Sequence, residues 1–167
     1  MMNLENLKSC LQEIRQTDIE LLNAALQNRD MILLIGNGGS NAVCSHLAQD
    51  YTKALGLKAL SFSDASRLTC YMNDYGIENA YAKFIEHFAT QKSICILVSS
   101  SGNSPNILNA AQHCFDNKID FIILSGFDED NKLRTNFSNK ACLSYYVPSR
   151  DYGIVENMHS IFLHSVI

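Results

Sequence analysis

The chain has 167 residues, of which 47% are hydrophobic, and its formal net charge is −4. This length and composition predict one globular domain with a sizeable core. Lysine and arginine are scattered without a basic run, which makes nucleic acid a poor candidate partner, and the apolar runs are far shorter than the ~20 residues of a membrane span. The N-terminal stretch lacks the apolar segment of a secretory leader, so we expect a cytoplasmic protein with no membrane partner.

Residues 3–28 carry leucine and isoleucine at helical spacing, with a slip between Ile14 and Ile19. They predict an N-terminal helix whose apolar stripe packs on its own domain, on another subunit, or on both. We therefore divide the single predicted domain, 1–167, into an N-terminal oligomerisation helix at 1–28 and an α/β core at 30–167.

After Asp30 the pattern changes to short, continuous apolar runs. Five runs predict strands, because a strand buried on both faces is apolar throughout: 31–35, 57–62, 94–99, 121–125 and 143–147. Helical patterns separate and follow these runs: 40–54, 77–90, 104–117, 129–138 and 154–167. Alternating strands and helices are typical of a parallel sheet covered on both faces, so we predict a three-layer α/β/α fold.

Two polar segments containing glycine follow predicted strands and open predicted helices. The first is GNGGS at 36–40, and the second is SSSGNS at 99–104. Helix N-termini present unpaired N–H groups to anions, glycine lets the backbone approach a ligand, and serine adds hydroxyl donors. Together the two segments predict a site for a phosphate monoester. A nucleotide-binding domain is disfavoured, because Asn41 stands where the dinucleotide motif requires a third glycine.

These two segments and the intervening SDASRLTCYMNDYG at 63–76 resemble the sugar isomerase (SIS) domain family, and within it the phosphoheptose isomerase branch. The resemblance covers residues 30–167, and the N-terminal helix also fits. It implies a flavodoxin-like sheet of five parallel strands, a homotetramer, and active sites at subunit contacts. It also implies the conversion of sedoheptulose 7-phosphate to D-glycero-D-manno-heptose 7-phosphate, in bacterial heptose synthesis for surface polysaccharide.

Carried over by position, the resemblance implies that residues of three segments bind the substrate. The glycine and serine segments and the NDYG motif supply Asn37, Gly38, Gly39, Ser40, Asn73, Asp74, Ser99, Ser100, Ser101 and Ser104. The resemblance further implies a zinc ion with ligands from two helices: His46, Asp50, Glu156 and His164. Asp50 and Glu156 are expected to contact the sugar as well. The family more often has glutamate at the position of Asp50 and glutamine at that of Glu156, which leaves the exact sugar open.

The implied reaction moves a proton between C1 and C2 of the sugar through a cis-enediol. A carboxylate and an imidazole in opposite protonation states can serve as base and acid, and zinc would polarise the reacting oxygens. We expect Asp50 to be the base and His164 the acid. The two roles of Asp50 compete, because a carboxylate bound to metal is not free to take a proton.

Other interpretations of the same residues stay open. The chain could be a non-catalytic SIS protein that binds a sugar phosphate or scaffolds a partner, or an isomerase of another sugar phosphate. His46 and Asp50 could be a surface i, i+4 pair, and His164 a buried histidine. His159 is a weaker ligand candidate, because it falls on a different helix face from His164. Retention of all four implied zinc ligands favours the enzyme.

Overall fold

The computed structural model describes residues 2–167 and contains one five-stranded sheet. Its strands are β1 (Met31–Gly36), β2 (Ala59–Ser61), β3 (Ser93–Ser99), β4 (Asp120–Ser125) and β5 (Leu143–Tyr146). The strand order is β2-β1-β3-β4-β5, and every neighbouring pair is parallel. This order confirms the predicted flavodoxin-like sheet.

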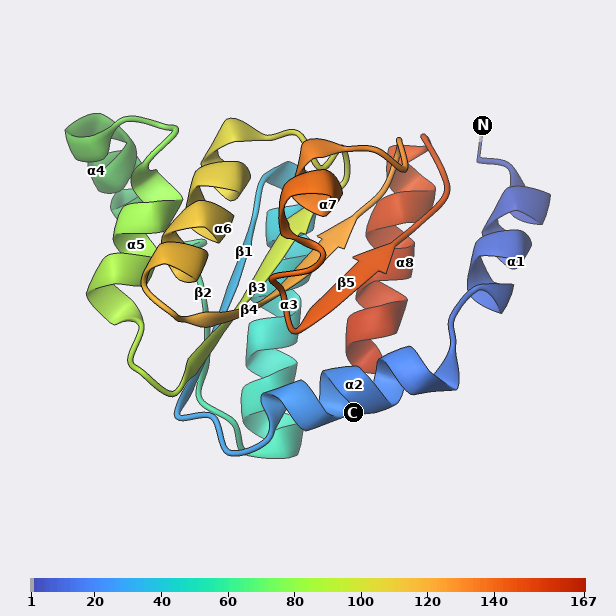
Figure 1. The fold of residues 1–167 in the computed structure, drawn as a ribbon, viewed down its shortest axis with the longest axis horizontal. Coiled ribbons are helices and arrows are strands. Elements are labelled where there is room, and N and C mark those ends of the chain that lie inside the picture. The colour runs from blue at the N-terminus through green and yellow to red at the C-terminus, as the bar shows by residue number, and fades with distance from the viewer. Residues whose placement is uncertain (1) are drawn as a thin grey trace.

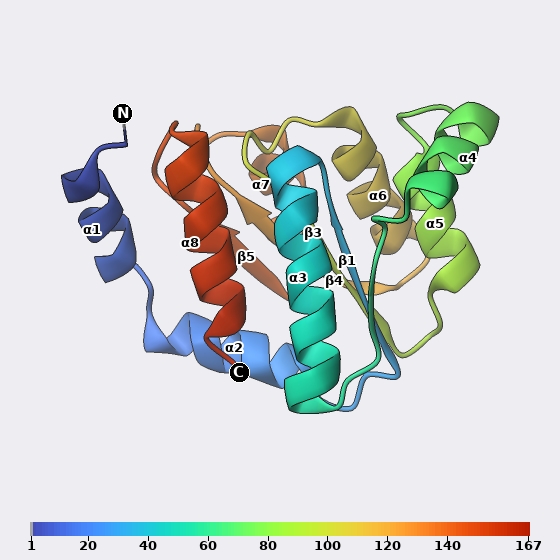
Figure 2. The same ribbon diagram turned by 180° about the vertical axis from the view of Figure 1, so that it is seen from behind.

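Helices cover both faces of this sheet and confirm the three-layer architecture. They are α1 (Leu4–Gln12), α2 (Gln16–Leu26), α3 (Gly38–Leu55), α4 (Ala65–Tyr75), α5 (Ala80–Phe88), α6 (Pro105–Asp116), α7 (Lys132–Phe137) and α8 (Tyr152–His164). Helices α5, α6 and α7 lie on one face (Figure 1), and α3 and α8 lie side by side on the other (Figure 2). Within residues 2–167 no helix is both long and apolar enough to span a bilayer.

The strands are apolar throughout because each face of the sheet packs against its own helices. In β1, Ile32 and Leu34 belong to a core cluster shared with α2, α3 and α8. Leu33 and Ile35, which point the other way, belong to a second cluster shared with α5, α6 and α7. Alternate residues of one short run therefore enter different cores, as a strand requires.

The N-terminal segment is helical as predicted, but it forms two helices rather than one. Helix α1 ends at Gln12, and Arg15 has an extended backbone, with φ −95° and ψ 138°, before α2 begins. The Arg15 guanidinium then bonds to Asp18 in the first turn of α2, with both N···O distances 2.8 Å. The break falls inside the slip of apolar spacing between Ile14 and Ile19, so the slip marked a turn rather than an irregular helix.

Helix α4 lies in a segment for which the sequence analysis named a motif but no helix. Asp64 caps its N-terminus by accepting a hydrogen bond from the backbone N–H of Arg67, at 2.9 Å. Gly76, with φ +77°, follows its last residue and has a backbone that favours glycine. The aspartate cap and the terminal glycine were the signals that could have identified this helix. The predicted helix at 77–90 is correspondingly shorter, and so is the predicted strand at 57–62.

Candidate active site

Two loops meet at one edge of the sheet, at the carboxyl ends of adjacent strands. The glycine loop (residues 36–40) joins β1 to α3, and the serine loop (residues 99–104) joins β3 to α6. Strands β1 and β3 are parallel and paired through Gly36 and Val98. The chain order along the sheet reverses beside β1, and crevices at such reversals hold ligands in open α/β sheets.

The two loops enclose a pocket of about 250 Å³. Its described lining consists of Asn37, Gly38, Gly39, Ser40, Val98, Ser99, Ser100, Ser101, Ser104, Tyr152 and Glu156. The fold thus brings the predicted residues of both loops together, and adds Glu156 from α8. Tyr152, in the first turn of α8, is a lining residue that the sequence analysis did not single out. It follows the helix cap Asp151, and that cap was the available signal for the start of the helix.

Hydroxyl groups from both loops approach one another in this pocket. The Ser99 hydroxyl lies 3.3 Å from that of Ser104, and the Ser40 hydroxyl lies 3.5 Å from that of Ser100. The N-termini of α3 and α6 open at the same place and present backbone N–H groups. Among the described residues that line the pocket none is lysine or arginine, so an anion would be held by neutral donors and helix dipoles.

Glu156 lies in the pocket against the glycine loop. A Cβ atom at position 39 would overlap with the Glu156 carboxylate, so any other residue there would displace this carboxylate from its place against the loop. We expected Glu156 to join the other three implied zinc ligands. Within this chain it does not, because the cluster of possible metal ligands among the described residues contains only those three. Two residues that are eight positions apart share a helix face but lie about 12 Å apart along the helix axis. The side chains of Glu156 and His164 therefore reach different places.

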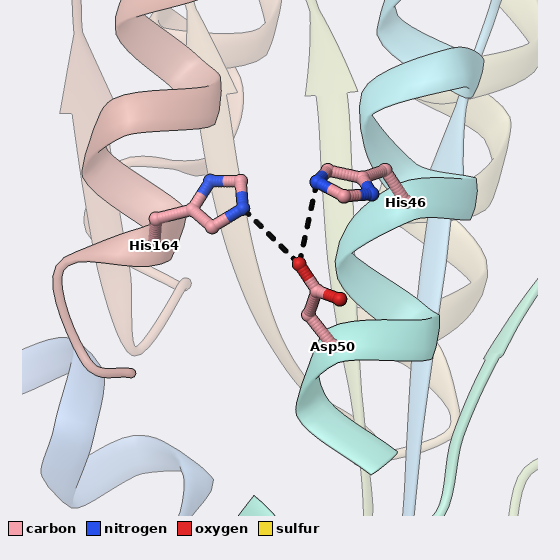
Figure 3. A group of neighbouring side chains, drawn as sticks. All are labelled: His46, Asp50 and His164. Carbon is pink, nitrogen blue, oxygen red and sulfur yellow. Dashed lines mark ion pairs between the residues drawn. The ribbon is translucent and has the colours of Figure 1, made fainter. Parts of the chain in front are cut away.

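The other three implied ligands converge between α3 and α8 (Figure 3). One oxygen of Asp50, Oδ2, lies 3.3 Å from Nε2 of His46 and 3.4 Å from Nε2 of His164. The side chains are partly exposed, by 58% for His46, 24% for Asp50 and 35% for His164. The cluster therefore lies at the surface, and solvent or a ligand can reach it.

The hydrogen bonds of His164 determine which atom faces Asp50. Nδ1 lies 2.7 Å from the backbone oxygen of Ser160, which can only accept, so Nδ1 carries the hydrogen. In the neutral ring, Nε2 then directs a lone pair at an Asp50 oxygen that also carries lone pairs. A cation between them, either a proton or a metal ion, removes this conflict. With one ligand atom from each residue all within 4.8 Å of one another, the donor set fits a zinc ion.

A buried tyrosine holds α8 beside α3 next to this cluster. The Tyr51 hydroxyl donates a hydrogen bond of 2.8 Å to the backbone oxygen of Leu163, the residue before His164. Burial raises the pKa of Tyr51, so the hydroxyl stays protonated and remains a donor. Tyr51 follows Asp50 directly in the chain, and the bond therefore couples the positions of Asp50 and His164.

Asn73 and Asp74 are not brought to the pocket by this chain. Both are exposed at the end of α4, and Asn73 donates a 2.9 Å hydrogen bond to Asp74. Helix α4 packs on α5. It lies beside the core cluster on one face of the sheet, whereas α3 and α8 cover the other face. Contact of these residues with a sugar stays a prediction.

His159 is fully buried rather than available as a ligand. Its Nε2 lies 3.1 Å from the backbone oxygen of Ser125, and Nδ1 has no hydrogen-bond partner among the described residues. Burial lowers the pKa of His159 to about 4, so the ring is neutral at pH 7. The weaker candidate of the sequence analysis is therefore a core histidine that ties α8 to the end of β4.

Comparison with known proteins identifies relatives over nearly the whole chain. A family model described as the SIS domain matches residues 4–126, a range that includes both loops. A phosphoheptose isomerase of Helicobacter pylori (strain Shi470) is 35% identical over 167 residues, covering 96% of this chain and 84% of the relative. Among solved structures, phosphoheptose isomerase GmhA from Neisseria gonorrhoeae has a TM-score of 0.85 and 26% identity, covering 98% of this chain and 90% of that one. A phosphoheptose isomerase from Francisella tularensis shares the fold, with a TM-score of 0.82 and 21% identity, covering 99% and 96%.

Proposed function

This chain belongs to the SIS domain family and, within it, to the phosphoheptose isomerases, and from that premise we propose that it converts sedoheptulose 7-phosphate to D-glycero-D-manno-heptose 7-phosphate. The reaction is an aldose–ketose isomerisation that leaves the phosphate intact. We further propose that the product enters bacterial heptose synthesis for surface polysaccharide.

One observation carries the proposal: helices α3 and α8 each contribute to both the pocket and the histidine cluster. On α3, Ser40 precedes His46 by six residues, which is about 9 Å of helical rise. On α8, Glu156 precedes His164 by eight residues, which is about 12 Å. A phosphorylated sugar held by its phosphate at the loops would extend along these helices toward the cluster, with its reacting end away from the phosphate.

The loops would bind the phosphate and the α8 carboxylate would bind the sugar. The serine hydroxyls and the N-termini of α3 and α6 supply donors to the phosphate oxygens. Glu156 can only accept hydrogen bonds when ionised, so it suits the hydroxyl groups of the sugar chain. Binding energy at the phosphate would position C1 and C2, which lie far from it.

At the reacting end, Asp50 would take a proton from C1 of the ketose and return it to C2. Figure 3 shows one Asp50 oxygen between the two imidazoles and the other directed away from them. The two roles of Asp50 can therefore be divided between its oxygens, with Oδ2 toward the histidines and Oδ1 free for the proton. His164 would protonate the carbonyl oxygen at C2 as the enediol forms, and would take a proton back from the C1 hydroxyl as the aldehyde forms.

We propose that His46, Asp50 and His164 hold a zinc ion, with Glu156 left in the sugar pocket. Bound zinc would polarise the carbonyl and hydroxyl oxygens of the substrate. Nδ1 of His164 is bonded to Ser160, so its roles as metal ligand and as acid both require Nε2 and are alternatives. Dependence of turnover on zinc would assign Nε2 to the metal, whereas full activity of the metal-free protein would assign it to the acid.

We also propose a homotetramer with active sites at subunit contacts, as the family resemblance implies. The exposed Asn73 and Asp74 would then reach the sugar across such a contact. Cross-linking and light scattering with and without substrate test the assembly. A monomer with full activity would contradict it.

A turnover assay tests the proposed function. Protein dialysed against a chelator is assayed with sedoheptulose 7-phosphate, with and without added zinc, beside fructose 6-phosphate and ribulose 5-phosphate. We expect turnover of the heptulose phosphate above the other two. Turnover of a shorter sugar instead would make the chain a different isomerase. Binding without turnover, and without proton exchange at C1 or C2, would make it a sugar-phosphate binding protein.

A further inference from the structure

The glycine loop and the first turn of α6, which follows the serine loop, are joined by a reciprocal pair of amide hydrogen bonds. Asn37 Nδ2 donates to Asn106 Oδ1 at 2.9 Å, and Asn106 Nδ2 donates to Asn37 Oδ1, also at 2.9 Å. Asn37 immediately precedes α3, and Asn106 lies in the first turn of α6. Asn106 is only 7% exposed, so both of its bonds are shielded from water.

Neighbouring donors define the orientation of both amides. The Tyr81 hydroxyl lies 2.7 Å from the backbone oxygen of Gly36 and 2.8 Å from Asn37 Oδ1. Burial raises the pKa of Tyr81 to about 12, so this hydroxyl is a donor at pH 7. The backbone N–H of Ile107 donates to Asn106 Oδ1 at 3.0 Å. The Tyr81 hydroxyl has one hydrogen, which the oxygens of Gly36 and Asn37 share, so the Ile107 N–H fixes the orientation of Asn106 and the reciprocal pair then fixes that of Asn37. Rotating either amide alone by 180° would place oxygen opposite oxygen and N–H opposite N–H, and would break both bonds of the pair.

This pairing changes what the Asn37 side chain is available to do. Its oxygen already accepts two hydrogen bonds and one of its two amide N–H groups is bonded to Asn106, so its side chain can offer a substrate only the remaining N–H, beside its backbone. Resting on the proposed function, we infer that Asn106 is a positioning residue: through Asn37 it sets the distance between the two loops that bind the phosphate.

The position of the pair in the surface supports this role. Asn37 and Ser104 line both the phosphate pocket and a second hollow of about 270 Å³, and Asn106 lines that second hollow. The amide pair therefore forms part of the wall between the two spaces. Without it, the glycine loop and the first turn of α6 would lose their direct side-chain link, and the donors on the two walls would no longer be held at one spacing.

A neutral pair suits this place better than an ion pair. The N-termini of α3 and α6 both open beside it, and their N–H groups are the predicted donors to the phosphate. The Glu156 carboxylate already lies against the glycine loop, and a second carboxylate in the wall would add to the repulsion of a phosphate, whereas an amide joins the loops without adding charge.

The variant Asn106→Asp tests the inference because it keeps the shape of the side chain. The carboxylate cannot donate to Asn37 Oδ1, so one bond is replaced by repulsion between two oxygens. We expect the KM for sedoheptulose 7-phosphate to rise about tenfold at pH 7.5, with kcat within about twofold of the wild-type value. As the pH is lowered and the new carboxyl is protonated, its donor returns, and the ratio of variant to wild-type KM should fall toward one.

The matched control is Asn109→Asp, which makes the same change one turn further along α6. Asn109 donates to the backbone oxygen of Glu78 at 3.0 Å and does not line the phosphate pocket. We expect its KM to stay near the wild-type value at every pH. Equal KM values for the two variants, or a ratio for Asn106→Asp that does not change with pH, would overturn the inference.

Two further measurements keep the test decisive. Calorimetric titration with inorganic phosphate measures the pocket without turnover, so a failure of the proposed isomerase activity leaves the inference testable. We expect Asn106→Asp to weaken phosphate binding about tenfold.

If Asn106→Asp does not fold, as judged by circular dichroism, Tyr81→Phe replaces it and should weaken phosphate binding several-fold by removing the donor to Asn37. Unchanged binding in Tyr81→Phe would then reject the inference.

Discussion

The pocket between the glycine and serine loops, where we propose that the phosphate binds, and the His46–Asp50–His164 cluster share two helices but are held in place differently. The pocket is formed by loops that leave the ends of β1 and β3, so the register of the sheet sets its shape. The cluster is formed by side chains from later turns of α3 and α8, and their meeting depends on how the two helices pack. From this difference we expect the pocket to bind the substrate and the cluster to carry out the reaction. Changes in the pocket should then alter KM, and changes in the cluster should alter kcat.

The largest expected effect is at Asp50. Asp50→Asn keeps the size of the side chain but removes the base and one anionic metal ligand. We expect kcat to fall by about 10²–10⁴-fold with little change in KM, because general acid–base groups contribute about that much. Steady-state kinetics measures both constants, and Asp130→Asn, at an exposed position, is the matched control. Full activity in Asp50→Asn would reject the assignment of the base and weaken the division between pocket and cluster.

The second effect concerns acid stability, through the histidine that ties α8 to the sheet. The pKa of buried His159 is lowered to about 4 in the folded protein, against 6.5 when it is solvated. Between these values the unfolded chain binds the extra proton and the folded chain does not, so stability is full above pH 6.5 and falls as the pH decreases toward 4. The loss is about 1.4 kcal/mol per pH unit, or about 2 kcal/mol between pH 6.5 and 5.

Urea unfolding at pH 7.5 and pH 5 measures this loss. We expect His159→Gln to be less stable than wild type at pH 7.5 but to lose about 2 kcal/mol less on acidification. His87→Gln, which changes an exposed histidine, controls for histidine content. An identical pH dependence in wild type and His159→Gln would show that another group dominates the acid response.

The third effect is at the serine loop. Ser100→Ala removes one buried hydroxyl that lies 3.5 Å from that of Ser40. Losing a hydrogen bond to a charged phosphate should raise KM about tenfold and leave kcat within about twofold. Ser66→Ala, at an exposed serine of α4, is the control. A fall in kcat at constant KM would contradict the division between a binding pocket and a reacting cluster.

The smallest effect is at the helix–helix contact beside the cluster. Tyr51→Phe removes the hydroxyl that donates to the Leu163 oxygen and leaves the ring in place. We expect about 1 kcal/mol less free energy of unfolding and a several-fold fall in kcat, with KM unchanged, because His164 loses part of its alignment with Asp50. Thermal unfolding and kinetics measure the two effects. A change in KM alone would mean that the α3–α8 contact supports the pocket instead.

Much of the fold follows from local patterns. Continuous apolar runs such as 31–35 could be assigned to a buried parallel sheet, because strands covered on both faces are apolar throughout and these short runs alternate with helical patterns. The two elements that differed, the broken N-terminal helix and α4, depend on caps and turn residues near Arg15 and Asp64 rather than on periodicity. The spacing of apolar residues carries no information about such polar caps and turns. The predicted helix boundaries were therefore less accurate than the predicted order of helices and strands.

The sequence by itself determined which residue types follow each strand, and hence the prediction of a phosphate site at the edge of a parallel sheet. It also determined that His46 and Asp50 share a helix face. Only the tertiary structure decided that His164 joins them, that Glu156 stays at the pocket, and that Asn37 bonds to Asn106, 69 residues away. The physical reason is that spacing along a helix defines a direction but not a partner, whereas contacts between distant residues depend on strand order and on the packing of helices.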